Sequence, residues 1–196
     1  MRKAEIKRKT KETDIHLVLD LDQSFDGPIE SGSPFLDHML DLLRKHSGMG
    51  LSVVCKGDKD IDMHHSAEDI AICLGEALGK AVGDKQGIER YGFYYVTMDE
   101  TLARCCLDLC GRISFVYTAA LPTARIGNLD TELIEHFFRS VAENAKMNLH
   151  LDLLRGTNTH HCIEGMFKAF ARALSMAISP SKRVQGVPST KGTLSN

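Results

Sequence analysis

The stretch His64-His65-Ser66-Ala67-Glu68 opens a run of helical apolar spacing in the first half of the chain. The stretch His160-His161-Cys162-Ile163-Glu164 opens a second run of the same kind. A single histidine precedes each motif, His38 by 26 residues and His136 by 24 residues. Apolar residues between these points also correspond, since Leu51 has the same place as Leu149. Recurrence of both the histidines and the apolar pattern predicts an internally duplicated strand-and-helix module.

The duplication divides the chain into half-modules at 1–90 and 91–196, which we expect to form one compact unit. Apolar residues recurring every three or four positions predict helices over 35–46, 64–82, 131–145 and 160–178. Alternating or short apolar runs predict strands over 15–21, 51–55, 91–97, 102–109 and 149–154. We expect 91–97 and 102–109 to form a hairpin whose second arm is extended by 112–118. Segments 23–34 and 122–130 are expected to be turn and loop.

Composition restricts the kind of partner. A net charge of −2 among 196 residues gives no electrostatic reason for binding nucleic acid or an anionic membrane, so a small ligand is expected. Basic residues between Arg2 and Lys11 alternate with other types and predict a solvated strand face. The six cysteines lack CxxC spacing, and no run has the length of a membrane span or the features of a signal peptide. A reducing cytoplasmic location is therefore expected.

The paired histidines predict metal ligands. Neighbouring helical residues point about 100° apart, so His64 and His65 should serve different ions. His65 and Glu68 are three residues apart and share a face, as do His161 and Glu164. Exchanging the halves must convert one site into the other. The expected sets are therefore His38, His65, Glu68 and His160 for one ion, and His136, His161, Glu164 and His64 for the other.

These sets contain imidazole nitrogens and one carboxylate, a mixture suited to a divalent manganese, iron or zinc ion. Three imidazoles and one carboxylate leave coordination positions open for substrate, which favours catalysis over a closed structural site. The sequence leaves open whether the ligands of one site come from one chain or from neighbouring subunits.

Six ordered motifs are distributed over nearly the whole chain. They are Phe35-Leu36-Asp37-His38-Met39-Leu40, Ile61-Asp62-Met63-His64-His65-Ser66-Ala67-Glu68-Asp69, Met98-Asp99-Glu100, Asp108-Leu109-Cys110-Gly111-Arg112, Glu135-His136-Phe137-Phe138 and Pro188-Ser189-Thr190-Lys191-Gly192. Together they resemble the imidazoleglycerol-phosphate dehydratase family, and the resemblance extends over nearly the whole chain. The family's fold consists of two similar halves, so the resemblance implies an α+β fold with a four-stranded mixed sheet packed on two helices in each half.

The resemblance also implies an activity and an assembly. The reaction is conversion of D-erythro-imidazole glycerol phosphate to imidazole acetol phosphate and water, in histidine biosynthesis. The resemblance implies two Mn²⁺ ions per active site, active sites between subunits, and trimers assembled into a 24-subunit particle. No carbonyl acidifies the carbon that loses its proton. A metal-bound imidazolate that expels the hydroxyl and leaves a diazafulvene-like intermediate would supply the activation.

The resemblance assigns further site residues. Glu12 matches the family's acid or base that contacts substrate, with Glu68 and Glu164 as competing catalytic groups for proton transfer. Arg90 and Arg112 match its phosphate-binding arginines, and the hairpin turn at 99–101 should bring them nearly opposite each other. Ser189 and Lys191 in the tail segment should add a hydroxyl and an ammonium group at the phosphate.

Two other functions remain alternatives. A two-metal phosphate-ester hydrolase would use the same ions to generate hydroxide, although it would be expected to use more carboxylates. A metal-storage or metal-sensing assembly would use the histidines alone and would not need the arginines. The chain also departs from the family in the long irregular segment 23–34 and in Thr97, which precedes the turn at Met98.

Overall fold

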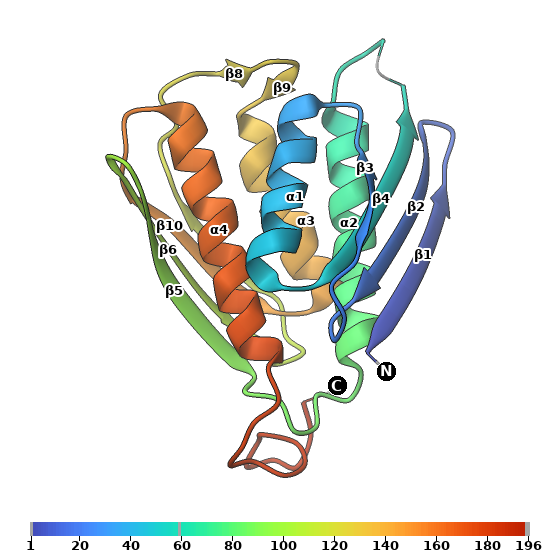
Figure 1. Ribbon diagram of the computed structural model, residues 1–196, viewed down its shortest axis with the longest axis vertical. Helices are drawn as coiled ribbons and strands as arrows, with labels where there is room; N and C mark the ends of the chain where they lie inside the picture. Colours follow the sequence, from blue (N-terminus) through green and yellow to red (C-terminus); the bar gives the residue numbers. More distant parts are fainter. Residues whose placement is uncertain (1, 59, 195–196) are drawn as a thin grey trace.

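Strands of alternating burial form two four-stranded sheets, which enclose a layer of four helices (Figure 1). The structure is a computed structural model that describes residues 2–58 and 60–194. The first sheet contains β1 (Lys3–Lys9), β2 (Thr13–Asp20), β3 (Asp26–Glu30) and β4 (Gly50–Gly57), and the second contains β5 (Tyr91–Met98), β6 (Thr101–Asp108), β7 (Ser114–Thr118) and β10 (Asn148–Arg155). The helices are α1 (Pro34–Ser47), α2 (His64–Val82), α3 (Glu132–Ala145) and α4 (Thr159–Ile178), and a short ribbon pairs β8 (Arg125–Ile126) with β9 (Leu129–Asp130).

The two sheets have the same topology. Their strand orders are β1-β2-β4-β3 and β5-β6-β10-β7, and in each only the last pair is parallel. Each half therefore contributes one mixed sheet and two helices in the same chain order, which confirms the α+β duplicated fold. The strand at the N-terminus buries Ala4 and Ile6 and exposes Lys3, Glu5 and Lys7, so its basic residues form the expected solvated face.

Helices of one half pack against helices of the other half. Helix α2 covers the first sheet and packs on α3, whereas α4 covers the second sheet and packs on α1. A cluster of aromatic rings fills the space between α3 and α4, with Phe138 at 4.7 Å from Phe167 and 5.4 Å from Phe170, measured between ring centroids. None of the described helices has the length and apolar character needed to cross a membrane.

Helix ends follow local sequence chemistry. Ser33 caps α1 by accepting a hydrogen bond from Leu36 N, and Pro34 occupies the first turn, where its missing N–H has no cost. Gly48 ends α1 in the left-handed conformation, with φ of 76°. Asn158 caps α4, so the histidines of the second motif lie in its first turn. The four predicted helices are confirmed to within a few residues.

Three predictions about strands are wrong. The segment predicted as loop, 122–130, contains the short ribbon of β8 and β9. The segment predicted as turn, 23–34, contains β3, which pairs in parallel with β4. Residues 114–118 form β7, a separate strand that pairs with β10 and does not extend β6. The chain turns at Gly111, whose φ is 83°, and therefore leaves the hairpin after Asp108.

The close approach of α2 and α3 generates a stability prediction. A Cβ atom at Gly75 would lie 2.7 Å from Asn144 Cβ and from Val141 O, so Gly75→Ala should force the helices apart and cost about 1–3 kcal/mol. Gly79 lies one turn later in α2, and its nearest such neighbour is 3.6 Å away. Gly79→Ala should therefore stabilise the helix by about 0.5–1 kcal/mol.

Thermal unfolding at matched protein concentration measures both changes. We expect a lower midpoint for Gly75→Ala and a higher one for Gly79→Ala. Midpoints that rise in both variants would contradict the assigned helix contact.

Candidate active site

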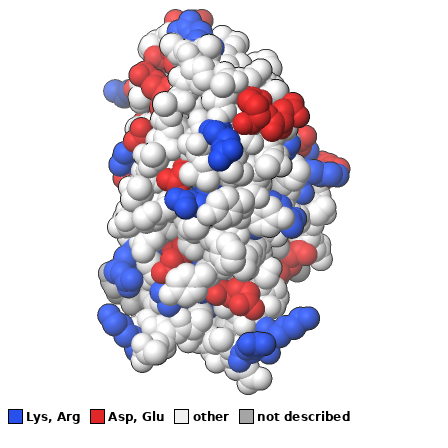
Figure 2. All heavy atoms as spheres, turned by 90° about the vertical axis from the view of Figure 1, so that its left-hand side faces the viewer, with Lys and Arg blue, Asp and Glu red and all other residues white. Residues whose placement is uncertain are grey.

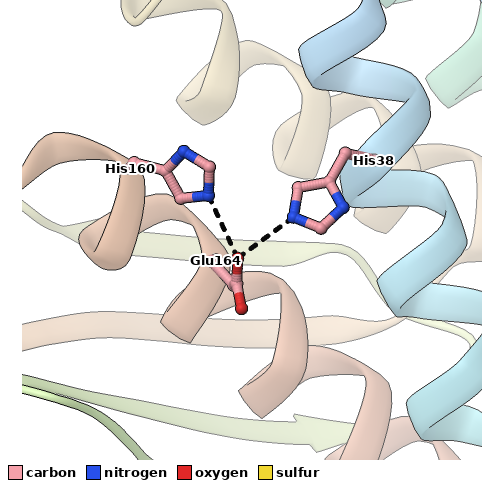
Figure 3. Close-up of side chains that lie close together, drawn as sticks. All are labelled: His38, His160 and Glu164. Atoms are coloured by element: carbon pink, nitrogen blue, oxygen red, sulfur yellow. Dashed lines mark hydrogen bonds and ion pairs between the residues drawn. The ribbon is translucent and has the colours of Figure 1, made fainter.

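His38 and His160 meet at one carboxylate between α1 and α4 (Figure 3). The Nε2 atom of His38 lies 3.1 Å from Glu164 Oε2, and the Nε2 atom of His160 lies 3.2 Å from the same oxygen. His160 and Glu164 are four residues apart, so they share a face of α4, whereas His38 comes from α1. The carboxylate is buried and both imidazoles are partly exposed, so the cluster is open on the imidazole side.

An equivalent cluster forms between α2 and α3. His136 Nε2 lies 3.0 Å from Glu68 Oε1, and the rings of His64 and His136 have centroids 5.0 Å apart. In both clusters the three ligand atoms lie within 4.8 Å of one another. His136 Nε2 is buried and makes no hydrogen bond of acceptable angle with any described residue. A ring nitrogen without a hydrogen bond beside a carboxylate fits a position for a divalent cation.

The grouping expected from the sequence is wrong within one chain. It placed His38 with Glu68 and His136 with Glu164, and the structure exchanges the two carboxylates. Because α1 packs on α4, His38 reaches the carboxylate of the other half. Residues three and four apart both share a helix face, so the sequence could not decide which histidine of a motif joins its Glu. Exchanging the halves still converts one cluster into the other, as the duplication requires.

The second histidine of each motif lies outside these clusters. His65 Nδ1 lies 2.9 Å from Asp58 Oδ2, and its Nε2 lies 3.7 Å from Glu12 Oε1. His161 Nδ1 lies 2.8 Å from Glu100 Oε2. These hydrogen bonds raise the pKa of both histidines above the ordinary value. The predicted acid or base Glu12 is thus beside the first motif, on the turn between β1 and β2.

A half-buried lysine distinguishes the two clusters. Lys168 Nζ lies 2.6 Å from Glu164 Oε1, whereas Ile72 occupies the corresponding position four residues after Glu68. Burial raises the pKa of Glu164, but hydrogen bonds from Lys168 and His38 outweigh it and lower the pKa. Glu164 is therefore ionised at neutral pH, with one oxygen held by Lys168 and the other facing the histidines.

The residues predicted to contact phosphate lie around one groove of about 630 Å³ between the start of β5 and the C-terminal tail. Arg90, Arg112, Ser189 and Lys191 all line it. Among the described residues, the side chains of Arg112 and Lys191 have no hydrogen-bond or ion-pair partner. These two cations are therefore available to an anion.

The guanidinium of Arg90, unlike the charged groups of Arg112 and Lys191, already has hydrogen-bond partners. Its Nε and Nη2 donate to Asp108 at 2.7 and 3.0 Å, and its Nη1 donates to Pro188 O at 2.8 Å. The hydrogen bond with Asp108 raises the pKa of Arg90, and the side chain is only 11% exposed. Arg90 thus fastens the tail to the second sheet and holds Ser189 beside the groove.

The clusters and the groove lie at opposite ends of the helix layer. His160 is in the first turn of α4, and Arg90 N donates to the carbonyl of Ala177 in its last turn. Seventeen residues of α-helix extend about 26 Å. Figure 1 shows the same separation, with the N-terminal ends of the helices at the top and the tail below them.

Three residues near the candidate ligands were given no role by the sequence reasoning: Asp58, Glu100 and Lys168. Carboxylates in polar turns and a helical lysine give no chemical signal by themselves. One signal was present for Glu100, because Glu12-Thr13 and Glu100-Thr101 occupy the same turn in the two halves. Extending the repeat comparison back to these turns would have paired Glu100 with Glu12.

Comparison with known proteins identifies one family. The family model for imidazoleglycerol-phosphate dehydratase matches residues 31–174. Relatives of that name from Lactiplantibacillus plantarum and Bacillus subtilis are each 52% identical over 194 residues, covering 99% of this chain and 100% of theirs. A solved imidazoleglycerol-phosphate dehydratase from Staphylococcus aureus has a TM-score of 0.83 at 42% identity, covering 91% of this chain and 99% of that one. Its counterpart from Pyrococcus furiosus has a TM-score of 0.83 at 30% identity, with coverage of 96% and 99%.

The contact between Arg90 and the tail can be tested by proteolysis. Arg90→Lys removes the planar pair with Asp108 and the bond to Pro188 O, because lysine is a point charge with a single nitrogen. Trypsin should then cut after Arg183 several-fold faster than in the unsubstituted protein. Arg104→Lys is the matched control, since Arg104 pairs with Asp152 through two nitrogens and makes no hydrogen bond or ion pair with the described residues of the tail. Equal cleavage rates in both variants would contradict the assigned role.

Proposed function

The chain belongs to the imidazoleglycerol-phosphate dehydratase family and is a hydro-lyase of histidine biosynthesis, and we propose that it dehydrates imidazole glycerol phosphate with two Mn²⁺ ions per active site. The substrate has an imidazole ring at one end and a phosphate at the other. Two His₂Glu clusters related by the internal repeat, together with a separate cationic groove, offer a partner for each end. That combination is the observation that carries the proposal.

The metal ligands proposed are the three residues of each cluster, completed by His65 and His161. Their nitrogen and oxygen donors suit manganese, iron or zinc, and the proposal of manganese follows the family resemblance. Ions bound there would hold the imidazole ring as its anion and orient it, so that ring electrons can expel the hydroxyl. Metal storage alone would need no cationic groove, and no observation favours it.

Proton transfer is proposed for the carboxylates. The hydroxyl leaves as water after gaining a proton, and the diazafulvene-like intermediate later loses the proton on its neighbouring carbon. Glu12 is half exposed on a turn and lies beside His65, where it can reach a bound substrate. Glu164 is ionised and Glu68 has the equivalent place in the other cluster, so both remain competitors for the same role.

Phosphate binding is proposed for the groove. Arg112 and Lys191 supply positive charge that no described residue neutralises, and Ser189 adds a hydroxyl. Arg90 would contribute mainly by holding the tail in place, because Asp108 and Pro188 already occupy its guanidinium.

Active sites are proposed to lie between subunits. A phosphorylated imidazole with a three-carbon chain spans on the order of 10 Å, given bonds of about 1.5 Å. It cannot bridge a metal cluster and a groove about 26 Å apart along α4 of one chain. The groove of one copy must then meet the clusters of another, which supports self-association. The trimers and the 24-subunit particle are proposed from the family resemblance.

An exposed aromatic face supports self-association. Tyr91, Phe93 and Tyr95 alternate along β5, and each is more than half exposed. Figure 2 shows this side of the molecule as largely uncharged surface broken by separate charged groups. The equivalent strand of the other sheet carries Lys3 and Glu5 instead. The six cysteines are free thiols, which agrees with the proposed cytoplasmic location.

Metal removal tests the proposed activity. Protein stripped with a chelator should produce no imidazole acetol phosphate, and restoring Mn²⁺ should restore turnover, because the ring is not activated without the ions. We also expect stripped protein to sediment as trimers, since each ion would join neighbouring chains. Full turnover by a particle of unchanged size after verified metal removal would contradict both expectations.

Mixed assemblies test the shared site. Arg112→Ala removes a groove cation and His160→Ala removes a cluster ligand, so each variant alone should be nearly inactive. Co-expression of the two should restore about a quarter of normal turnover, because random pairing joins an intact groove to an intact cluster in that fraction of sites. Co-expression of Arg112→Ala with Lys191→Ala is the control and should restore nothing. Equal activity in the two mixtures would contradict sites built from different chains.

A further inference from the structure

Two carboxylates hold the histidines that lie outside the clusters. Asp58 Oδ2 is 2.9 Å from His65 Nδ1, and Glu100 Oε2 is 2.8 Å from His161 Nδ1. We propose that Asp58 and Glu100 are positioning residues that fix the tautomer and ring orientation of these histidines, so that each Nε2 is presented as an unprotonated metal ligand. This inference rests on the proposed function, which makes His65 and His161 metal ligands.

The tautomer follows from the chemistry of the contacts. An ionised carboxylate can only accept hydrogen bonds, so the Nδ1 atom facing it must carry the ring proton. In a neutral imidazole the lone pair is then on Nε2. The Nε2 atoms are 3.7 Å from Glu12 Oε1 in one half and from Asp99 Oδ2 in the other, which is too far for a hydrogen bond. Both nitrogens are therefore free to bind a cation.

Glu100 is fixed on both of its oxygens. Its Oε1 accepts hydrogen bonds from Thr157 N at 3.0 Å and from Asn158 N at 2.8 Å, while Oε2 accepts from His161. The bond from His161 and the two backbone bonds hold the pKa of Glu100 well below its usual range. Because Asn158 caps α4, Glu100 ties the hairpin turn to the start of the helix that carries His161.

Asp58 is held less firmly. Its Oδ2 accepts from His65 Nδ1, whereas its Oδ1 is buried and has no hydrogen-bond partner among the described residues. Both carboxylates therefore accept a hydrogen bond from a histidine Nδ1, but only Glu100 is also fixed by backbone donors. Replacing each carboxylate with an amide should therefore affect metal binding differently.

In Glu100→Gln, the two backbone donors require the amide oxygen to remain on their side. The amide NH₂ group must then face His161 and donate to Nδ1, which moves the ring proton to Nε2 and blocks metal binding. In Asp58→Asn, no backbone donor fixes the amide, so its oxygen can still accept from His65. We therefore expect Mn²⁺ affinity to fall about 10- to 100-fold in Glu100→Gln and less than about tenfold in Asp58→Asn.

Mn²⁺ binding can be measured on the intact assembly from the electron paramagnetic resonance signal of free Mn²⁺, with circular dichroism as the check of folding. Glu5→Gln is the matched control, because Glu5 also accepts from a histidine, His16, at 2.9 Å, but on the outer face of the first sheet. That variant should bind Mn²⁺ as the unsubstituted protein does. His161→Ala, alone and combined with Glu100→Gln, completes the set.

A positioning role requires that Glu100 act only through His161. Glu100→Gln should therefore cause no further loss of Mn²⁺ affinity in the His161→Ala background. A second loss of the same size in the His161→Ala background would show that Glu100 merely holds the turn. Unchanged Mn²⁺ affinity in folded Glu100→Gln would overturn this inference but not the proposed function. Unsubstituted protein that binds no Mn²⁺ would overturn the proposed function and this inference with it.

Discussion

Packing between helices of opposite halves is the constraint on which the rest of the structure depends. Each histidine cluster takes one ligand from α1 or α3 and two from a helix of the other half, so neither cluster exists without that contact. The aromatic rings between α3 and α4 and the close approach at Gly75 fix the spacing of the helices. A protein interior packed to crystal-like density transmits such spacing to the ligand atoms at the helix ends.

The four central helices also run in the same direction, with their N-terminal ends together in Figure 1. The histidines of both motifs lie in the first turns of α2 and α4, and Glu68 and Glu164 follow in the second turns. The C-terminal ends adjoin Arg90 and the tail instead. One direction of helix packing thus places the candidate metal ligands at one end of the layer and the groove lined by Arg112 and Lys191 at the other. The proposal of active sites between two copies follows from that separation.

The duplicated fold was predictable because apolar periodicity and the spacing of the histidines repeat together. The strand β3 was missed because it is short, half buried and paired in parallel with a strand formed later in the chain. Residues 114–118 were predicted as extended chain, but their partner β10 lies about 30 residues further on, so the local pattern could not show that they form a separate strand. The grouping of ligands was mispredicted for a similar reason. A motif shows which residues share a helix face, but the partner across the interface is decided by tertiary packing. Asp58 and Glu100 look like ordinary turn residues until the fold brings them to the histidines.

Duplication has preserved the ligands more strictly than their surroundings. Lys168 lies beside Glu164, whereas Ile72 follows Glu68 at the same spacing, so the side chains of the two clusters differ by one positive charge. The side chain of Glu100 accepts hydrogen bonds from two backbone N–H groups, whereas the side chain of Asp58 accepts none from the described backbone. Both differences act on groups adjacent to the proposed ligands, where local charge and orientation govern metal binding. Identical ligand sets in the two halves therefore do not make equivalent sites.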